Sequence, residues 1–256
     1  MVRPNAFTPG GNVPRPRKMP ELVAWQIADD ITSQGIEAGD VLPPERELTA
    51  AYGVSRGTLR EALRILESYG LISVKSGPSG GPTVQPFRFD AMIGPLSIFM
   101  KIRGTPLSEV IEGRLALEPV MARFVAMNAG DADLAELERL VDGMDTEVED
   151  ETKFRQYNRL FHEGVARMSG NFVLECFACT LSGIIDGHKA GVRYSTARRK
   201  AINASHRRLL EAIRDRNGES AAAEARSHVE EFHMYLQRRF PNLLVGPVRD
   251  VARFQQ

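Results

Sequence analysis

Apolar positions recur with helical spacing along most of the chain, starting close to its N-terminus. The first run predicts a helix over residues 21–34, with apolar positions at Leu22, Trp25, Ile27, Ala28 and Ile31. After two glycines, Pro43 and Pro44 introduce a second helix over residues 45–52, which carries acidic residues in its first turn, as the helix dipole favours. Ser55 is a good N-cap for a third helix that runs to about Tyr69, and Gly70 ends it.

A short β-hairpin is expected after these three helices. Residues 71–75 and 83–85 are predicted to be strands, and the glycine- and proline-rich stretch between them, 76–82, is predicted to be a turn. Three short helices and a hairpin within about 65 residues is the element order of a winged helix-turn-helix. Residues 86–90 are the expected linker.

The pattern beyond residue 90 contains no convincing strand. It predicts amphipathic helices near 91–103, 107–128, 131–149, 151–169, 171–190, 196–216 and 219–239. Short links between helices of this length are typical of an antiparallel bundle. The predicted fold is mainly α, with an N-terminal winged helix-turn-helix (three helices plus a β-hairpin wing) and a C-terminal all-α antiparallel bundle of six or seven helices.

These patterns divide the chain into five parts. Residues 1–19 hold several prolines and glycines and four basic residues but no acid, which predicts a disordered tail that could also follow a phosphate backbone. The winged helix-turn-helix is expected over 20–86, the linker and first connecting helix over 87–104, and the bundle over 105–240. Residues 241–256 are left as a C-terminal tail with no assigned structure.

Composition narrows the class of protein but identifies no partner. The 256 residues are 43% hydrophobic and 26% charged, which fits a soluble globular protein and excludes collagen-like and fully disordered classes. Lys plus Arg and Asp plus Glu both number 33, so a nucleic-acid surface must come from local clustering. No apolar run approaches the roughly 20 residues of a membrane span, and no secretory signal is recognised. Two cysteines are too few for a disulfide framework, so a reducing cytoplasm is the expected location.

The third predicted helix carries a row of basic residues. Arg56, Arg60 and Arg64 recur every fourth residue on a stripe separate from the apolar one. Such a row could be only a solvated face, but in a helix-turn-helix the N-terminal end of this helix enters the major groove. Arginine suits a guanine edge or a phosphate because its planar donors bind bidentately. Thr58 could donate to a phosphate or offer its methyl group to thymine.

Two further residues belong to this candidate DNA interface. Arg46, at the start of the second predicted helix, would reach the adjacent phosphate backbone. Gly77, at the tip of the predicted hairpin, would allow the wing to approach the sugar-phosphate chain closely.

Three histidines in the second half of the chain are candidate metal ligands. His162, His206 and His228 fall on three separate predicted helices, and Asn158 lies four residues before His162, on the same helical face. Three imidazoles facing one cavity would suit Zn, Ni or another borderline divalent metal. Spacing across separate helices does not show convergence, so dispersed core or surface histidines are the alternative.

The N-terminal third of the chain resembles a known family of regulators. The stretches LPPEREL (42–48), YGVSRGTLREAL (52–63) and LESYGLI (66–72) are similar to the DNA-binding domain of GntR-family bacterial transcription regulators, apart from Pro44, where the family usually has Ser. The resemblance implies that Arg46, Arg56, Thr58, Arg60 and the Gly77 wing tip contact double-stranded DNA. It also implies a homodimer on an inverted-repeat operator.

Residues from about 107 to 239 resemble the FCD domain of the FadR-type branch of that family. The similarity lies in EGRLALEP (112–119), the segment 158–162, SGN (169–171) and the segments around His206 and His228. It implies a metal held by position 158 and the three histidines, although metal-binding members have Asp where this chain has Asn158, a neutral and weaker ligand. It also implies a small organic acid beside the metal, gripped by Arg114 in the family's recurrent arginine position, with Arg193 as a second candidate.

Together these observations predict a metabolite-responsive transcriptional regulator and not an enzyme. Repression relieved by the bound acid is the expected direction, because most relatives act in this way. Two alternatives remain at this stage: a ligand-independent DNA-binding dimer whose bundle serves only for association, and a metal-dependent enzyme tethered to DNA. Three histidine ligands with an open position can activate water, but no general base stands out in the sequence.

Overall fold

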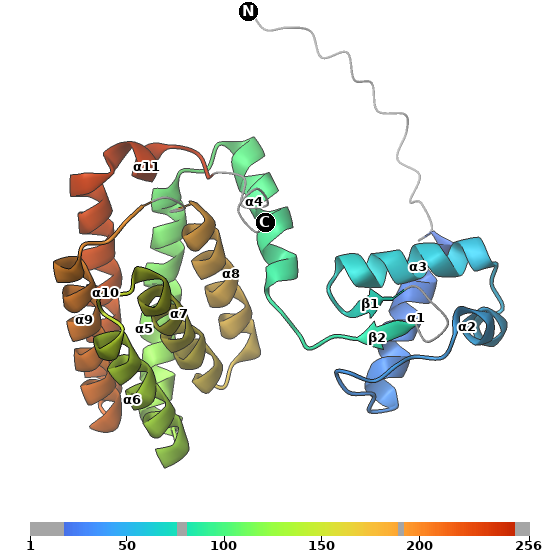
Figure 1. Cartoon of the computed structure of the whole chain (residues 1–256), viewed down its shortest axis with the longest axis horizontal. Helices are drawn as coiled ribbons and strands as arrows, with labels where there is room; N and C mark the ends of the chain where they lie inside the picture. The colour runs from blue at the N-terminus through green and yellow to red at the C-terminus, as the bar shows by residue number, and fades with distance from the viewer. Residues whose placement is uncertain (1–17, 76–80, 189–191, 249–256) are drawn as a thin grey trace, which may run out of the picture. The chain divides into compact units, whose positions relative to one another are not determined.

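A computed structural model of the chain describes residues 18–75, 81–188 and 192–248 (Figure 1). The chain forms two compact units, residues 1–91 and residues 92–256. Most of the predicted N-terminal tail and the predicted wing tip at Gly77 lie outside the described residues.

The first unit has three helices followed by a two-stranded antiparallel sheet. Its elements are α1 (Met19–Ser33), α2 (Glu45–Tyr52), α3 (Arg56–Ser68), β1 (Ile72–Val74) and β2 (Pro82–Val84). Ile72 pairs with Val84 and Ser73 with Thr83, so the two strands form the predicted hairpin. The predicted winged helix-turn-helix order is confirmed, with strand ends that differ by one residue from the predicted ones.

Local chemistry fixes the turn between α2 and α3. Gly53 ends α2 in the left-handed conformation with φ of 63°, which glycine adopts without steric cost. Ser55 then caps α3 by accepting a hydrogen bond from the backbone N–H of Thr58. The hydroxyl of Tyr52 donates to Asp30 at 2.7 Å, which ties the end of α2 to α1.

The buried face of α3 holds this unit together. Its four buried residues, Leu59, Ala62, Leu63 and Leu66, recur at helical spacing and pack with Val23, Ala24 and Ile27 of α1. The basic residues of α3 are thereby left on the outer face of the helix.

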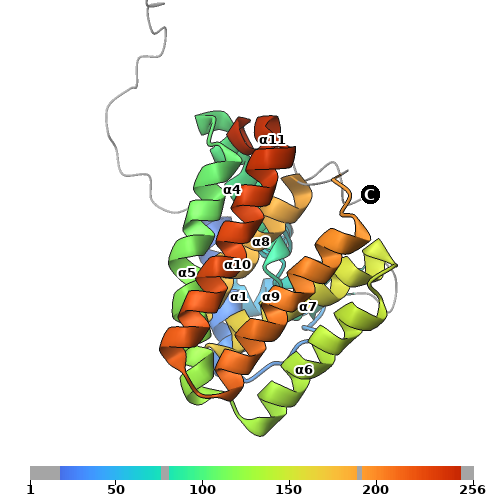
Figure 2. The same cartoon turned by 90° about the vertical axis from the view of Figure 1, so that its left-hand side faces the viewer.

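The second unit is helical throughout its described residues. Its helices are α4 (Asp90–Arg103), α5 (Leu107–Asn128), α6 (Asp131–Thr146), α7 (Glu151–Met168), α8 (Phe172–His188), α9 (Thr196–Arg214), α10 (Gly218–Arg239) and α11 (Pro241–Val245). Helices α5 and α10 lie side by side along much of their length (Figure 2). Small buried residues of α10, Ala221 and Ala225, allow this close packing. The predicted helical bundle is confirmed.

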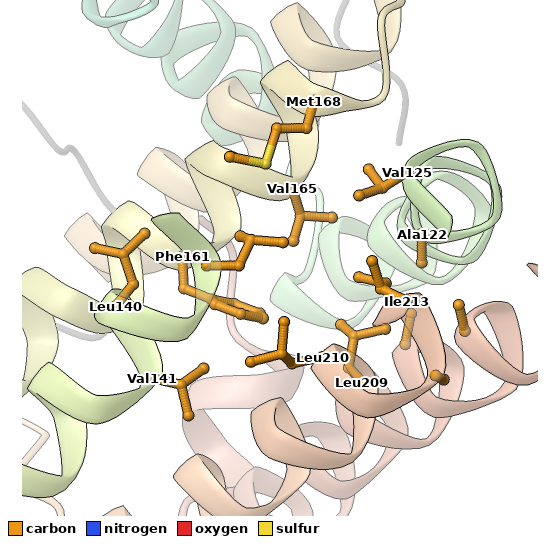
Figure 3. Close-up of a cluster of buried hydrophobic side chains, with 14 of the residues drawn as sticks. Ala122, Val125, Leu140, Val141, Phe161, Val165, Met168, Leu209, Leu210 and Ile213 are labelled. Carbon is orange, nitrogen blue, oxygen red and sulfur yellow. The ribbon is translucent and has the colours of Figure 1, made fainter. Parts of the chain in front are cut away.

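The bundle core is formed mainly by side chains from five helices. Figure 3 shows Phe161 of α7 among Leu140 and Val141 of α6 and Leu210 of α9. Ala122 and Val125 of α5 and Ala221 and Ala225 of α10 belong to the same cluster. This apolar core borders the histidines described below: the ring of Phe161 lies against that of His206, with centroids 4.5 Å apart and an interplanar angle of 40°.

The segment after α10 packs onto the bundle, although the sequence pattern predicted no structure for residues 241–256. Leu243 and Leu244 of α11 and Val248 are buried, and the backbone N–H of Val248 donates to the carbonyl of Thr105 at 3.0 Å. A five-residue helix is too short to show a helical hydrophobic period, which is why the sequence pattern missed it. None of the described helices combines the length and apolar character that crossing a membrane requires.

The capping hydrogen bond of α3 leads to a stability prediction. Replacing Ser55 with Ala removes the acceptor for the Thr58 N–H, so we expect the free energy of unfolding of the first unit to fall by about 1 kcal/mol. Urea unfolding followed by the fluorescence of Trp25, the chain's single tryptophan and a residue of α1, measures this change. Ser55→Asp, which restores a capping oxygen, should recover most of the loss, and equal midpoints for Ser55→Ala and the unaltered protein would contradict the assigned cap.

Candidate functional site

Three histidines from separate helices meet inside the bundle. His162 of α7, His206 of α9 and His228 of α10 each offer a ring nitrogen, and these atoms lie within 4.8 Å of one another. The ring centroids are 5.1 Å apart for His162 with either partner and 4.5 Å apart for His206 and His228. The structure therefore shows the convergence that sequence spacing left open.

Burial holds two of these imidazoles in the neutral form. Loss of solvent lowers the pKa of His206 to about 3, with a further contribution from the nearby Arg114 cation. The pKa of His228 is also lowered well below its ordinary value, first by burial and then by His206 and Arg114. A neutral imidazole keeps a lone pair on one nitrogen, which is the form that binds a metal.

Within this histidine triad (His162, His206 and His228), His206 is the residue whose polar atoms lack partners within the ranges that the structure describes. Both of its ring nitrogens are buried, and neither has a hydrogen-bond partner among the described residues. A buried polar group without a partner costs about 1–3 kcal/mol, so such groups in native proteins usually have a bound water or ion. Three imidazoles with one unsatisfied member fit a borderline divalent metal such as Zn or Ni.

A buried ion pair on α5 lies beside the triad. The Nε of Arg114 donates to the carboxylate of Glu118, one helical turn later, and both side chains are buried. The other carboxylate oxygen of Glu118 lies 3.8 Å from Nδ1 of His162. The guanidinium of Arg114 also lies over the ring of Phe232, 5.8 Å from its centroid.

Of the two arginines predicted to grip an effector, only Arg114 lies in this buried group. Arg193 precedes α9 and its side chain is exposed. Asn158 lies one helical turn before His162 on α7 and is half-buried. Glu118 was not among the predicted site residues, although its i, i+4 spacing from Arg114 is the sequence signal for an ion pair.

Of the candidate DNA-contacting residues, Arg56, Thr58 and Arg60 lie on α3 and Arg46 lies in the first turn of α2. Arg46, Arg56 and Arg60 are exposed, and Thr58 is half-buried with its hydroxyl 2.9 Å from that of Ser55. Arg60 pairs with Glu45 of α2 at 2.9 Å. An exposed pair of this kind contributes at most about 1 kcal/mol, so Arg60 can exchange Glu45 for a phosphate or a base at little cost.

Comparison with known families and proteins agrees with both halves of this description. Residues 20–80 match the family of bacterial regulatory proteins called the gntR family, and residues 109–231 match the FCD domain. The chain belongs to the GntR family and carries an FCD domain. Family and relatives are transcriptional regulators rather than enzymes, so the protein is a transcriptional regulator with a DNA-binding and a ligand-sensing domain.

Named relatives are similar over most of their length. The chain is 28% identical over 235 residues to the putative L-lactate dehydrogenase operon regulatory protein of Escherichia coli K12, covering 87% of this chain and 88% of the relative. It is 26% identical over 218 residues to the HTH-type transcriptional repressor NanR of Citrobacter rodentium, covering 83% of each protein. The solved structure of a Streptococcus agalactiae GntR protein matches the fold with a TM-score of 0.66 at 24% identity, covering 84% of this chain and 99% of that one.

The triad leads to a prediction about metal content. Replacing His206 with Ala removes one of three candidate ligands, so we expect the affinity for Zn²⁺, measured by isothermal titration calorimetry, to fall by at least about tenfold. His233→Ala, which removes a histidine of α10 outside the triad, is the matched control and should bind as the unaltered protein does. Equal Zn²⁺ binding by the His206→Ala variant would show that this histidine is not a ligand.

The same burial predicts how the stability of the metal-free protein depends on pH. In the folded state burial lowers the pKa of His206 to about 3 and lowers that of His228 as well, whereas in the unfolded chain an imidazole has a pKa near 6.5. Below pH 6.5 the unfolded chain therefore takes up protons that the folded chain does not, and the free energy of unfolding falls.

We expect the urea midpoint of the metal-free protein to decrease from pH 7 to pH 5. The decrease should be smaller for His206→Gln, which removes one of the two buried titrating groups. A midpoint that stays constant over this range in the unaltered protein would contradict the neutral, buried state of the two rings.

Proposed function

We propose that the protein is a metabolite-responsive repressor whose bundle holds a divalent metal and, beside it, a small carboxylate-containing effector. The observation that carries this proposal is the unpartnered pair of ring nitrogens on His206, within reach of two further imidazoles and of the buried Arg114. A bundle that served only for dimer association would have no need of buried ring nitrogens without hydrogen-bond partners. The proposal therefore gives the bundle a sensing role.

The residues of the site would divide the work in the following way. His162, His206 and His228 would hold the metal, which we expect to be Zn, with Ni as the next candidate, and Asn158 would contribute at most a weak, neutral oxygen ligand. A bound metal would supply a Lewis-acid position for a carboxylate oxygen of the effector. Arg114 would orient that carboxylate through the guanidinium donors that Glu118 does not use, because charge-assisted bonds to arginine are strong and directional. The exposed position of Arg193 makes it the weaker candidate of the two arginines.

At the other end of the chain, α3 would read the DNA. In helix-turn-helix proteins the N-terminal part of this helix enters the major groove, so Arg56, Thr58 and Arg60 would contact bases and phosphates there and Arg46 the adjacent backbone. Gly77, outside the described residues, stays a prediction for the wing. Two copies of the chain would bind an inverted-repeat operator, since protein two-fold symmetry matches operator symmetry.

Exposed apolar side chains offer surfaces for such a dimer. On α4 these are Ile98, Phe99 and Ile102, and on α8 they are Phe172, Val173 and Phe177. Where such side chains form a contiguous apolar surface, that surface is typical of an association site.

For the direction of control we propose repression that the effector relieves. The C. rodentium relative is named as a repressor, and repression relieved by the effector is our assignment for this chain. The effector changes DNA affinity only if it binds the DNA-competent and DNA-incompetent arrangements with different affinity.

The decisive experiment measures operator affinity with and without a candidate acid. An operator selected from genomic fragments is titrated with the Zn²⁺-loaded protein, and fluorescence anisotropy reports binding. L-Lactate is the first acid to test, because the E. coli relative is named for the L-lactate dehydrogenase operon. We expect the effective acid to weaken operator binding; tighter binding in its presence would reverse the direction, and indifference to every acid and metal tested would contradict the sensing role.

A substitution on α3 tests the DNA interface separately. Arg56→Ala should weaken binding to the selected operator by about 1–3 kcal/mol, because it removes a charged, bidentate donor from the groove. Zn²⁺ affinity should not change. Arg139→Ala, which removes an exposed arginine of α6 in the bundle, is the control, and an equal loss of operator affinity in both variants would indicate a nonspecific charge effect.

A further inference from the structure

Ser205, the residue before His206 on α9, contacts His228 on α10. Its hydroxyl oxygen lies 2.8 Å from Nδ1 of His228 and 2.7 Å from the backbone carbonyl oxygen of Ile202. Ser205 is 1% exposed and His228 7% exposed, so water does not compete freely for either group. The two helices α9 and α10 are therefore joined at this point by a buried polar contact.

The protons of this contact can be assigned from its geometry. A hydroxyl carries one proton, and a backbone carbonyl can only accept, so the Ser205 proton points to Ile202. The Ser205 oxygen then has only lone pairs to offer to His228. The 2.8 Å contact is a hydrogen bond only if Nδ1 of His228 carries the proton and donates it.

This assignment determines which nitrogen of His228 is free. A neutral imidazole carries a single N–H, so a ring with its proton on Nδ1 has a bare Nε2 with its lone pair available. The hydrogen bond made by one ring nitrogen sets which nitrogen binds a metal, and such outer contacts also fix the orientation of the ring.

We propose that Ser205 is a positioning residue of the triad, which holds His228 in the Nδ1–H tautomer and so presents Nε2 as the metal-binding atom. This inference extends the metal site proposed above and rests on it only for its effect on affinity. The two buried rings differ in this respect. Nδ1 of His228 has a hydrogen-bond partner, whereas neither ring nitrogen of His206 has one in the described part of the chain. One ring of the triad is thus oriented before any ligand arrives.

The tautomer can be observed directly in the metal-free protein. Two-bond ¹H–¹⁵N correlation spectra of histidine-labelled protein distinguish protonated from bare ring nitrogens, and a His228→Gln sample assigns the resonances. We expect a protonated Nδ1 and a bare Nε2 for His228. A protonated Nε2 would overturn the proposal, whether or not the protein binds a metal.

A pair of serine substitutions then tests the consequence for binding. Ser205→Ala removes the acceptor, so we expect a loss of the single Nδ1–H form and a decrease in Zn²⁺ affinity of about 10- to 100-fold. Ser169→Ala is the matched control, because Ser169 is also buried and its hydroxyl likewise donates to a carbonyl three residues earlier, that of Ala166. This control should leave both the His228 spectrum and the Zn²⁺ affinity unchanged.

The outcomes separate the two proposals. If Ser205→Ala keeps the Nδ1–H tautomer and binds Zn²⁺ as tightly as the unaltered protein, Ser205 is not a positioning residue. If the unaltered protein shows the Nδ1–H tautomer but binds no divalent metal, the metal site fails while the tautomer assignment stands. If Ser205→Ala does not fold, the spectrum of the unaltered protein still decides whether Nδ1 carries the proton.

Discussion

The burial of His206 and His228 beside the half-buried His162 is the constraint on which the rest of the site depends. Buried polar groups need partners, and here the chain supplies one for His228 and leaves both nitrogens of His206 without one. Two neighbouring groups act on these rings. Ser205 contacts the ring of His228, and the buried Arg114–Glu118 ion pair places a carboxylate oxygen near the ring of His162. A metal ion would satisfy a nitrogen of His206 in a way that a packed apolar core cannot.

The first unit carries the DNA-binding domain and the second carries the ligand-sensing domain. The connecting helix α4 packs with the second unit. In α4, Ile93 packs against α8 at Gly183, where the Cδ1 of Ile93 leaves no room for a Cβ atom. Ile93 is also part of the apolar cluster that includes Ile184 of α8 and Val110 of α5. A rearrangement of α8 would therefore act on the segment through which the chain passes from one unit to the other.

Sequence reasoning succeeded where local chemistry determines the structure. The ends of α2 and α5 were predicted to the residue, and Ser55 was identified as the N-cap of α3, because proline, glycine and capping side chains act on their neighbours in sequence. It missed α11, since five residues carry no periodic signal and tertiary packing of Leu243 and Leu244 stabilises them. The meeting of His162, His206 and His228 could not be derived from spacing, because it depends on how three helices pack. For the same reason the Ser205 contact with His228 had no signature in the sequence.

The most direct test of this account is a crystal structure of the protein grown with Zn²⁺, with diffraction data collected on both sides of the zinc absorption edge. The account predicts an anomalous peak among the three histidines, about 2.0–2.1 Å from Nε2 of His228 and from a ring nitrogen of each of His162 and His206. It would be contradicted by the absence of any anomalous peak there, with the nitrogens of His206 hydrogen-bonded instead to ordered water or to protein.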